Sequence, residues 1–201
     1  MNTVPTLTKD DVANVAGKIR IGAAWDPSSR GYGGIMARIS KKAGGDLDAL
    51  AVTFEDGEPT RMAGIGNNDP LKNGTVVHSG DSTTGQGEGD DETIDLDLVG
   101  IDPEIEKIVL MVAAFKVINK KMGDTGFGGV DNVEFTVYDM DGGSPKKEFR
   151  IRPSLLGREN VCIVAVLNRT ASGWVMRKLN TKVHVEHGNK DALLRAAVNA
   201  G

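Results

Sequence analysis

The sequence predicts an all-β protein, an antiparallel β-sandwich that ends in one C-terminal helix. Three observations predict it. Polar and apolar residues alternate with a period of two from residue 18 onward. Short apolar runs recur between turn sequences such as "EDGE", "DMDGG" and "TASG". A helical pattern is evident only at the end of the chain. Many short strands with few helices between them are typical of a sandwich.

The strands are indicated by alternation or by short apolar runs. In "KIRIGAAWD" (18–26), Ile19, Ile21, Ala23 and Trp25 share one face, as expected for a half-buried strand. "TIDLDL" (93–98) shows the same alternation, with Asp95 and Asp97 on the opposite face. Further strands are predicted within 47–54, 107–115, 133–140, 161–167 and 174–179.

The two ends of the chain differ from this pattern. Residues 1–16 are predicted to form an N-terminal arm, separate from one domain over 17–201. "NKDALLRAAVNAG" predicts a helix over 189–200, with Asn189 as its cap and Asp191 in its first turn. Its apolar stripe includes Leu193 and Ala197, and we expect this stripe to dock on the sandwich.

Composition restricts the function classes. The chain has 201 residues, of which 39% are hydrophobic, which suits one domain with a substantial core. Its single cysteine, Cys162, lies in the apolar run "VCIVAVL", so we exclude an intrachain disulfide and a multi-cysteine zinc site and expect an inert thiol.

No apolar run approaches the roughly 18 residues of a membrane span, and the N-terminus does not resemble a leader. We expect a cytoplasmic location, with peripheral association with the membrane as the alternative. A net charge of −4 and few aromatics argue against nucleic-acid binding.

Negative charge is concentrated in one part of the sequence. Residues 73–106 contain ten acidic residues and no Lys or Arg, and the glycine-rich stretch "GDSTTGQGEGDDET" (80–93) holds five of the acids. Its spacing matches neither phosphate-binding glycine motif. Asp81 and Glu92 stand at positions 1 and 12 of an EF-hand loop, but the intervening positions do not match that motif.

A divalent cation would explain why so many carboxylates lie together. Two carboxylates about 4 Å apart repel by roughly 1 kcal/mol in water and about 4 kcal/mol at an intermediate dielectric. Calcium takes oxygen ligands, and "GGDLDA" and "GNNDP" provide two further oxygen-rich segments. Singly, each segment also fits a solvated loop, a cap or a turn. Together they favour a metal site. The candidate ligands from these segments are Asp46, Asp48, Asn67, Asn68, Asp81, Glu88, Asp90, Asp91 and Glu92.

The same segments resemble those of a known family. "HSGDSTTGQGEGDDETI", "GGDLDALA", "GIGNND" and "AWD" are similar to signature segments of the tellurium resistance TerD family of bacterial stress proteins. The resemblance extends to "EKIVLMVAAF", "TGFGGVDNVEFTVYD" and "GWVMRKL", and so covers about residues 17–200. It implies a calcium-binding β-sandwich without enzymatic activity, tied to resistance to tellurite and other chemical stress.

The resemblance also implies a ligand set. Asp81, Asp90, Asp91 and Glu92 fall on the acidic loop of the family, Asp46 and Asp48 on its Asp-x-Asp, and Asn67 and Asn68 on its paired asparagines. Backbone oxygens near Gln86 and Glu88 would assist. Ser82 stands where Asn is usual, Glu88 where Asp is common, and Gly129 where Gln is common, so the resemblance does not define the number of ions. One or two calcium ions are expected.

Three functions follow as hypotheses. The leading one is a non-catalytic calcium-binding stress module whose ion organises the acidic loop for a partner, either a protein or a membrane-associated stress complex. The second is a metal-dependent hydrolase, with His78 beside the loop. The third is a calcium-gated lipid or protein adaptor that uses basic side chains. These side chains are Lys41, Lys42, Lys146, Lys147, Arg150 and Arg152. The sequence favours neither a monomer nor a homo-oligomer.

Overall fold

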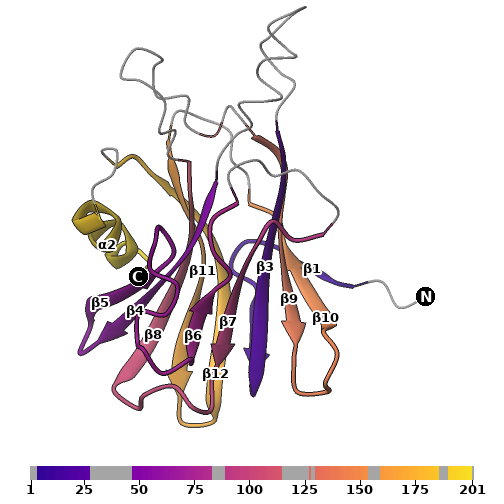
Figure 1. Ribbon diagram of the computed structural model, residues 1–201, viewed down its shortest axis with the longest axis vertical. Coiled ribbons are helices and arrows are strands. Elements are labelled where there is room, and N and C mark those ends of the chain that lie inside the picture. Colours follow the sequence, from indigo (N-terminus) through magenta and orange to yellow (C-terminus); the bar gives the residue numbers. More distant parts are fainter. Residues whose placement is uncertain are drawn as a thin grey trace, which may run out of the picture.

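A computed structural model describes residues 4–27, 47–82, 89–114, 127, 130–153, 159–185 and 190–200. Two six-stranded sheets pack face to face (Figure 1). The first sheet has the order β1 (Thr6–Leu7), β10 (Lys146–Ile151), β9 (Val130–Asp139), β3 (Lys18–Pro27), β7 (Glu92–Asp97) and β6 (Val76–His78). The second has the order β2 (Val12–Val15), β12 (Gly173–Val183), β11 (Val161–Thr170), β8 (Ile105–Ala113), β4 (Asp48–Glu55) and β5 (Glu58–Ala63). The predicted sandwich is confirmed, and among the strand pairs of the described residues only β1–β10 is parallel.

The main core lies between the two sheets. Ile19, Ile21, Ala23 and Trp25 of β3 all point into it, as their alternation predicts. Ile94 and Leu96 of β7 join them, so this sheet buries one face.

The second sheet is buried on both faces. Its outer face forms a second apolar cluster, which includes Val52, Val109 and Ile163. Helix α2 (Lys190–Val198) covers part of this cluster with Leu193, Ala196 and Ala197. Burial on both faces explains why β8 and β11 read as continuous apolar runs in the sequence. The predicted docking of the C-terminal helix is therefore confirmed, whereas Asn189 lies outside the described residues.

The N-terminal segment lies within the sheets rather than apart from them. β1 pairs with β10 in one sheet, and β2 pairs with β12 in the other. The buried Lys178 holds the segment, because its Nζ donates to the carbonyl oxygen of Leu7 at 2.8 Å. The structure thus differs from the arm expected over residues 1–16. Strands of two and four residues are too short to show a period, and backbone hydrogen bonds to existing sheet edges hold them in place.

The turn that follows β5 holds a strained residue. Gly64 and Asn67 exchange two backbone hydrogen bonds, and the residues between them, Ile65 and Gly66, both have positive φ (47° and 76°). Two-residue turns of this kind favour Asn-Gly, since a β-branched side chain is penalised in the left-handed region. Ile65 is 47% exposed, so burial offsets little of this cost.

We predict that Ile65→Asn raises the free energy of unfolding by about 1 kcal/mol, because Asn tolerates the left-handed backbone. For a domain of this size, the melting temperature should rise by about 2–4 °C. Differential scanning calorimetry measures the change. Val99→Asn is the control, since Val99 is 80% exposed and is not among the residues with positive φ. A loss of stability in Ile65→Asn would show that the apolar contacts of Ile65 outweigh its backbone strain.

Candidate functional site

A buried carboxylate anchors the candidate site. Glu92, the first residue of β7, is 1% exposed and points toward the opposite sheet. Its Oε2 accepts a hydrogen bond from the backbone N–H of Ala49 in β4 at 2.8 Å. Its Oε1 accepts one from the N–H of Ser82 at 3.0 Å. Both oxygens are therefore held, and one side chain links the two sheets to the segment that follows β6.

His78, at the end of β6, fixes the same carboxylate from a third direction. Its ring is buried, and its Nδ1 accepts a hydrogen bond from the N–H of Gly80 at 3.0 Å. The proton of the neutral ring therefore lies on Nε2, which donates to Oε2 of Glu92 at 3.2 Å. Both ring nitrogens are thus engaged, and His78 orients Glu92.

Two further carboxylates converge on Glu92. Asp48, the first residue of β4, and Asp81 each place an oxygen so that these two atoms and one oxygen of Glu92 all lie within 4.8 Å of one another. Glu92 is buried, Asp48 is partly buried and Asp81 is exposed, so the group runs from the interior to the surface. We call Asp48, Asp81 and Glu92 the carboxylate cluster.

Asp91 lies next to this cluster but binds to β3. Its Oδ2 accepts a hydrogen bond from the N–H of Trp25 at 2.9 Å, and its own N–H donates to the carbonyl of Ala23. Burial raises the pKa of Asp91, and the negative charges of Asp26, Asp90 and Glu92 raise it further. The hydrogen bond from the N–H of Trp25 lowers the pKa of Asp91 and so offsets part of this rise.

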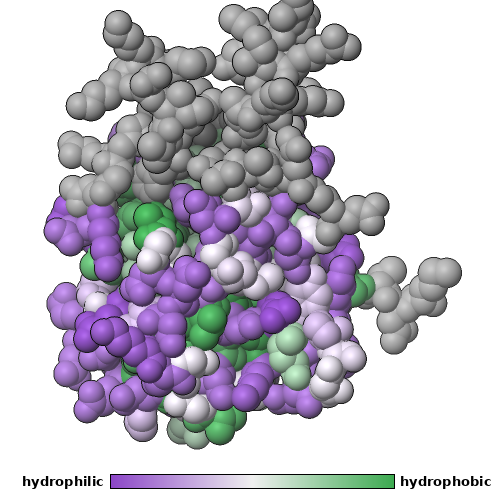
Figure 2. All heavy atoms as spheres, in the orientation of Figure 1, coloured by the Kyte–Doolittle hydropathy of each residue, from purple (hydrophilic) through white to green (hydrophobic). Residues whose placement is uncertain are grey.

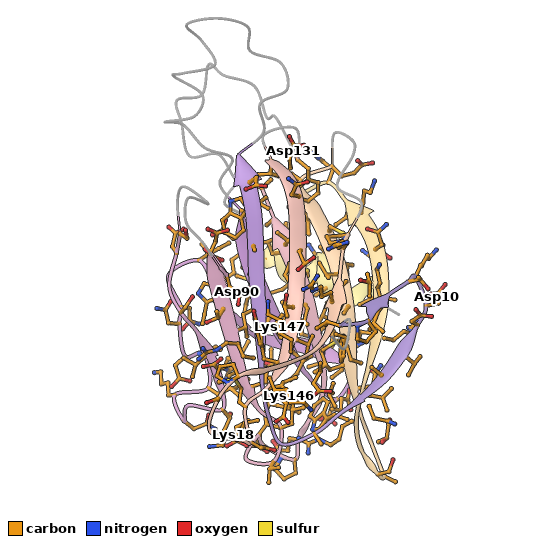
Figure 3. The ribbon with its side chains drawn as sticks, turned by 90° about the vertical axis from the view of Figure 1, so that its right-hand side faces the viewer. Asp10, Lys18, Asp90, Asp131, Lys146 and Lys147 are labelled. Atoms are coloured by element: carbon orange, nitrogen blue, oxygen red, sulfur yellow. The ribbon has the colours of Figure 1, made fainter. Side chains whose placement is uncertain are left out.

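Asp90 points the other way. Its carboxylate lies over Gly22 of β3, so closely that a side chain at Gly22 would collide with it. Gly22 alternates with the inward-facing Ile21 and Ala23, so Asp90 rests on the outer face of the sheet, where Figure 3 labels it. Burial, together with a hydrogen bond to Asp90, raises the pKa of Tyr138 to about 12. Among the described residues, Asp90 is therefore not brought into the carboxylate cluster.

The paired asparagines separate as well. The amide of Asn67 donates to the carbonyl of Met62 at 3.1 Å and so stabilises the turn after β5. The carbonyl of Asn68 accepts a hydrogen bond from the N–H of His78 at 2.7 Å, and its side chain lies near Gly80. Asn68 is thus close to the segment that carries Asp81, whereas Asn67 is committed to its own turn.

Three predicted ligands lie outside the described residues: Asp46, Gln86 and Glu88. Two residues act at the candidate site in ways that the sequence analysis did not predict. The first is His78, whose orienting role depends on contacts between β6 and β7 that no local sequence pattern encodes. The second is Asp26, which the sequence analysis considered only as part of "AWD". It follows the inward-facing Trp25 near the end of β3, and its negative charge raises the pKa of Asp91.

The cluster lies at one end of the sandwich. Glu92 pairs with Ala23 near the end of β3, and Asp48 begins β4. Figure 3 labels Asp131, which pairs with Asp26, at this end and Lys18 at the other. Side chains at strand ends are free of the apolar core, so charged groups can gather there while the sheets hold their backbone.

The chain is similar to proteins that are named for stress response and for tellurium resistance. Over 161 residues it is 32% identical to "Stress response protein SCP2" of Bacillus subtilis (strain 168), covering 78% of each chain. It is 29% identical to "Tellurium resistance protein TerX" of Serratia marcescens, over 80% of this chain and 82% of the relative.

Solved structures share the fold. A homologue of the telluride resistance protein TerD from Streptomyces coelicolor A3(2) superposes with a TM-score of 0.64 at 22% identity, covering 86% of this chain and 93% of the other. The model of the TerD domain matches residues 5–186, which include β1 to β12. The chain therefore belongs to the TerD domain family.

Proposed function

We propose that this protein is a non-enzymatic, calcium-binding stress-response module of the tellurium resistance type. The observation that carries the proposal is the carboxylate cluster of Asp48, Asp81 and Glu92, which brings three oxygens within 4.8 Å of one another at the end of a rigid sandwich. Three acids at such distances repel unless a cation lies between them.

The donor set fits calcium. All three cluster side chains offer carboxylate oxygens, the ligands that calcium prefers. His78 faces Glu92 with Nε2–H, so in this tautomer its nitrogen is a donor and does not add a nitrogen ligand. Oε1 of Glu92 accepts one N–H, from Ser82, and retains a second lone pair for a metal, whereas Oε2 accepts two donors, from Ala49 and His78.

A bound ion would act on the acidic segment. Asp81 precedes residues 83–88, and Glu92 follows them, so an ion held by both would tie the two ends of that segment to β4 through Asp48. We infer that the loop then offers a partner surface, with a protein or a membrane-associated stress complex as its target. The names of the relatives, which refer to stress response and tellurium resistance, support this role.

The hydrolase hypothesis is weakened at His78, the residue that it places beside the loop. Hydrolysis requires a group that can take a proton from water. Both ring nitrogens of His78 form hydrogen bonds within the protein, so neither is free for this role.

The adaptor hypothesis is weakened by the pairing of its basic residues. Arg150 and Arg152 both contact Glu134, and Lys146 pairs with Glu148 at 2.7 Å. Lys147 lies over the ring of Tyr138, on the face shown in Figure 3. Lys41 and Lys42 lie outside the described residues. Within the described part of the chain, no helix is long and apolar enough to cross a bilayer.

Calorimetric titration of chelator-treated protein should show calcium binding. Asp48→Asn and Asp81→Asn should each weaken it about tenfold or more, which corresponds to about 1.4 kcal/mol, because each removes a charged oxygen from the cluster. Asp56→Asn is the matched control, since Asp56 is exposed in the turn at the far end of β4. Asp90→Asn should have a smaller effect, because Asp90 lies on the outer face. A wild-type titration without heat, confirmed by an unchanged melting temperature, would contradict the proposal.

Glu92→Gln should lower the free energy of unfolding of the calcium-free protein by about 1–3 kcal/mol. Both carboxylate oxygens accept N–H donors, so the amide nitrogen of glutamine would face a donor at one of them. Urea denaturation in chelator measures the change. The exposed Glu58 provides the control variant Glu58→Gln, which should stay within about 0.5 kcal/mol of wild type. Equal stability of Glu92→Gln and wild type would show that these hydrogen bonds contribute little.

A further inference from the structure

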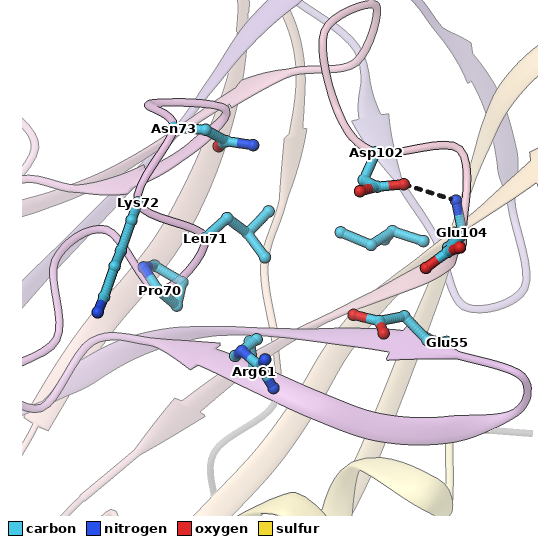
Figure 4. A pocket seen from close by; sticks show the side chains of 9 residues that line it. Glu55, Arg61, Pro70, Leu71, Lys72, Asn73, Asp102 and Glu104 are labelled. Atoms are coloured by element: carbon cyan, nitrogen blue, oxygen red, sulfur yellow. Dashed lines mark hydrogen bonds between the residues drawn. The ribbon is translucent and has the colours of Figure 1, made fainter.

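A second polar site lies at the other end of β4. Asp48 of the carboxylate cluster begins this strand, and Glu55, which lines a pocket, ends it. The pocket has a volume of about 430 Å³ and opens between the β4–β5 hairpin, the turn at residues 70–73 and the turn at residues 102–105 (Figure 4). This volume falls in the range of small-molecule sites.

Charged side chains occupy positions that would otherwise extend the core. In β4, Ala49 and Ala51 pack between the sheets, and two-residue alternation continues through Thr53 to Glu55. In β5, Ala63 packs in the same core, and Arg61 lies two residues before it. Arg61 and Glu55 line the pocket together with the apolar Leu71 and Ile105. The space between the sheets thus ends in a cavity whose lining is mainly polar, with a small apolar contribution from Leu71 and Ile105.

The charges in the pocket are separated by sign. Arg61 and Lys72 lie on one side, whereas Glu55, Asp102 and Glu104 lie on the other (Figure 4). Among the described residues, no ion pair joins the two sides. Instead, the acidic side chains accept hydrogen bonds from residues close to them in the sequence. Glu55 accepts a hydrogen bond from the hydroxyl of Thr60 at 3.0 Å, and Asp102 accepts one from the N–H of Glu104 at 3.0 Å.

Asn73 adds a neutral donor to the pocket. Its Oδ1 accepts hydrogen bonds from the N–H and the hydroxyl of Thr75, at 3.1 and 2.7 Å. The oxygen is therefore committed to the turn, and the amide N–H₂ group points toward the pocket (Figure 4). The amide of Asn73 thus adds a hydrogen-bond donor to the wall of the pocket that also carries Leu71 and Lys72.

We propose that this pocket binds a small basic amino acid of the arginine or lysine type. Its α-carboxylate would meet Arg61 and Lys72, since guanidinium and ammonium groups bind carboxylates. Its two cationic groups would meet Glu55, Asp102 and Glu104, and its methylene chain would cover Leu71 and Ile105. Three acids and two bases give the pocket a net charge of −1, which complements a ligand of net charge +1. The site does not depend on calcium.

The test is an NMR titration of the full-length, ¹⁵N-labelled protein with L-arginine and with L-lysine, at constant ionic strength. Backbone amide shifts should change within residues 55–61, 70–75 and 101–106, and should saturate. Agmatine lacks the carboxylate and L-norleucine lacks the side-chain cation, so each should bind at least about tenfold more weakly. L-glutamate should not bind, because it places a second carboxylate against the acidic side.

Two variants test whether the charged residues of the pocket cause the changes in amide chemical shift. Arg61→Gln and Asp102→Asn should each weaken arginine binding about tenfold or more, and the melting temperature of each verifies folding. Asp102→Asn keeps Oδ1 as an acceptor for Glu104. Lys9→Gln and Asp10→Asn are the charge-matched controls, since both residues are exposed in the turn between β1 and β2.

Three outcomes would overturn the proposal. The first is the absence of saturable shifts in these segments. The second is equal binding of agmatine, norleucine and arginine, which would indicate unspecific ionic or apolar contact. The third is shifts with calcium chloride that arginine does not displace, which would make the acidic side a cation site. The Asp48→Asn variant should bind arginine normally, so a failure here is distinguishable from a failure of calcium binding at the cluster.

Discussion

A carboxylate buried between two sheets must be compensated by hydrogen bonds, because its desolvation is otherwise too costly for a domain of marginal stability. Glu92 meets this requirement with donors from three places: Ala49 in the opposite sheet, Ser82 after β6, and the ring of His78. The direction in which the chain leaves β6 and the position of the first residues of β4 both depend on these bonds. The geometry of the carboxylate cluster therefore follows from one buried acid.

The sandwich distributes its apolar surface unequally. The sheet that carries β3 and β7 buries one face and exposes the other, on which Asp90 and Tyr138 lie. The sheet that carries β4 and β8 is covered on both faces, on the outer one partly by α2. On the face seen in Figure 2, hydrophobic side chains form only small separate areas among hydrophilic ones. The carboxylate cluster and the charged pocket both lie at the ends of the strands.

β4 connects the two polar regions. Its middle residues are almost fully buried, whereas Asp48 and Glu55 at its ends are partly exposed. Asp48 and Glu55 lie at opposite ends of an eight-residue strand, about 23 Å apart at the usual rise per residue, so a ligand at one end has little electrostatic effect on the other. The carboxylate cluster is rich in one sign of charge, which suits a cation. The pocket carries both signs, which suits a ligand that also carries both.

The sequence by itself determined the fold class, the docked helix and the acidic character of the site, because alternation and composition are local properties. It also determined seven of the strands, namely β3, β4, β7, β8, β9, β11 and β12. It did not indicate β6, which has only three residues, or β5 and β10, which are rich in polar and exposed residues. The short strands β1 and β2 depend on hydrogen bonds to partners that are distant in sequence. The sequence also could not separate Asp90 from Asp91 and Glu92, which are adjacent in sequence. Only the packing of β3 against β7 decides that Glu92 turns inward, Asp91 binds to Trp25 and Asp90 lies over Gly22, since successive side chains at a strand end face different neighbours.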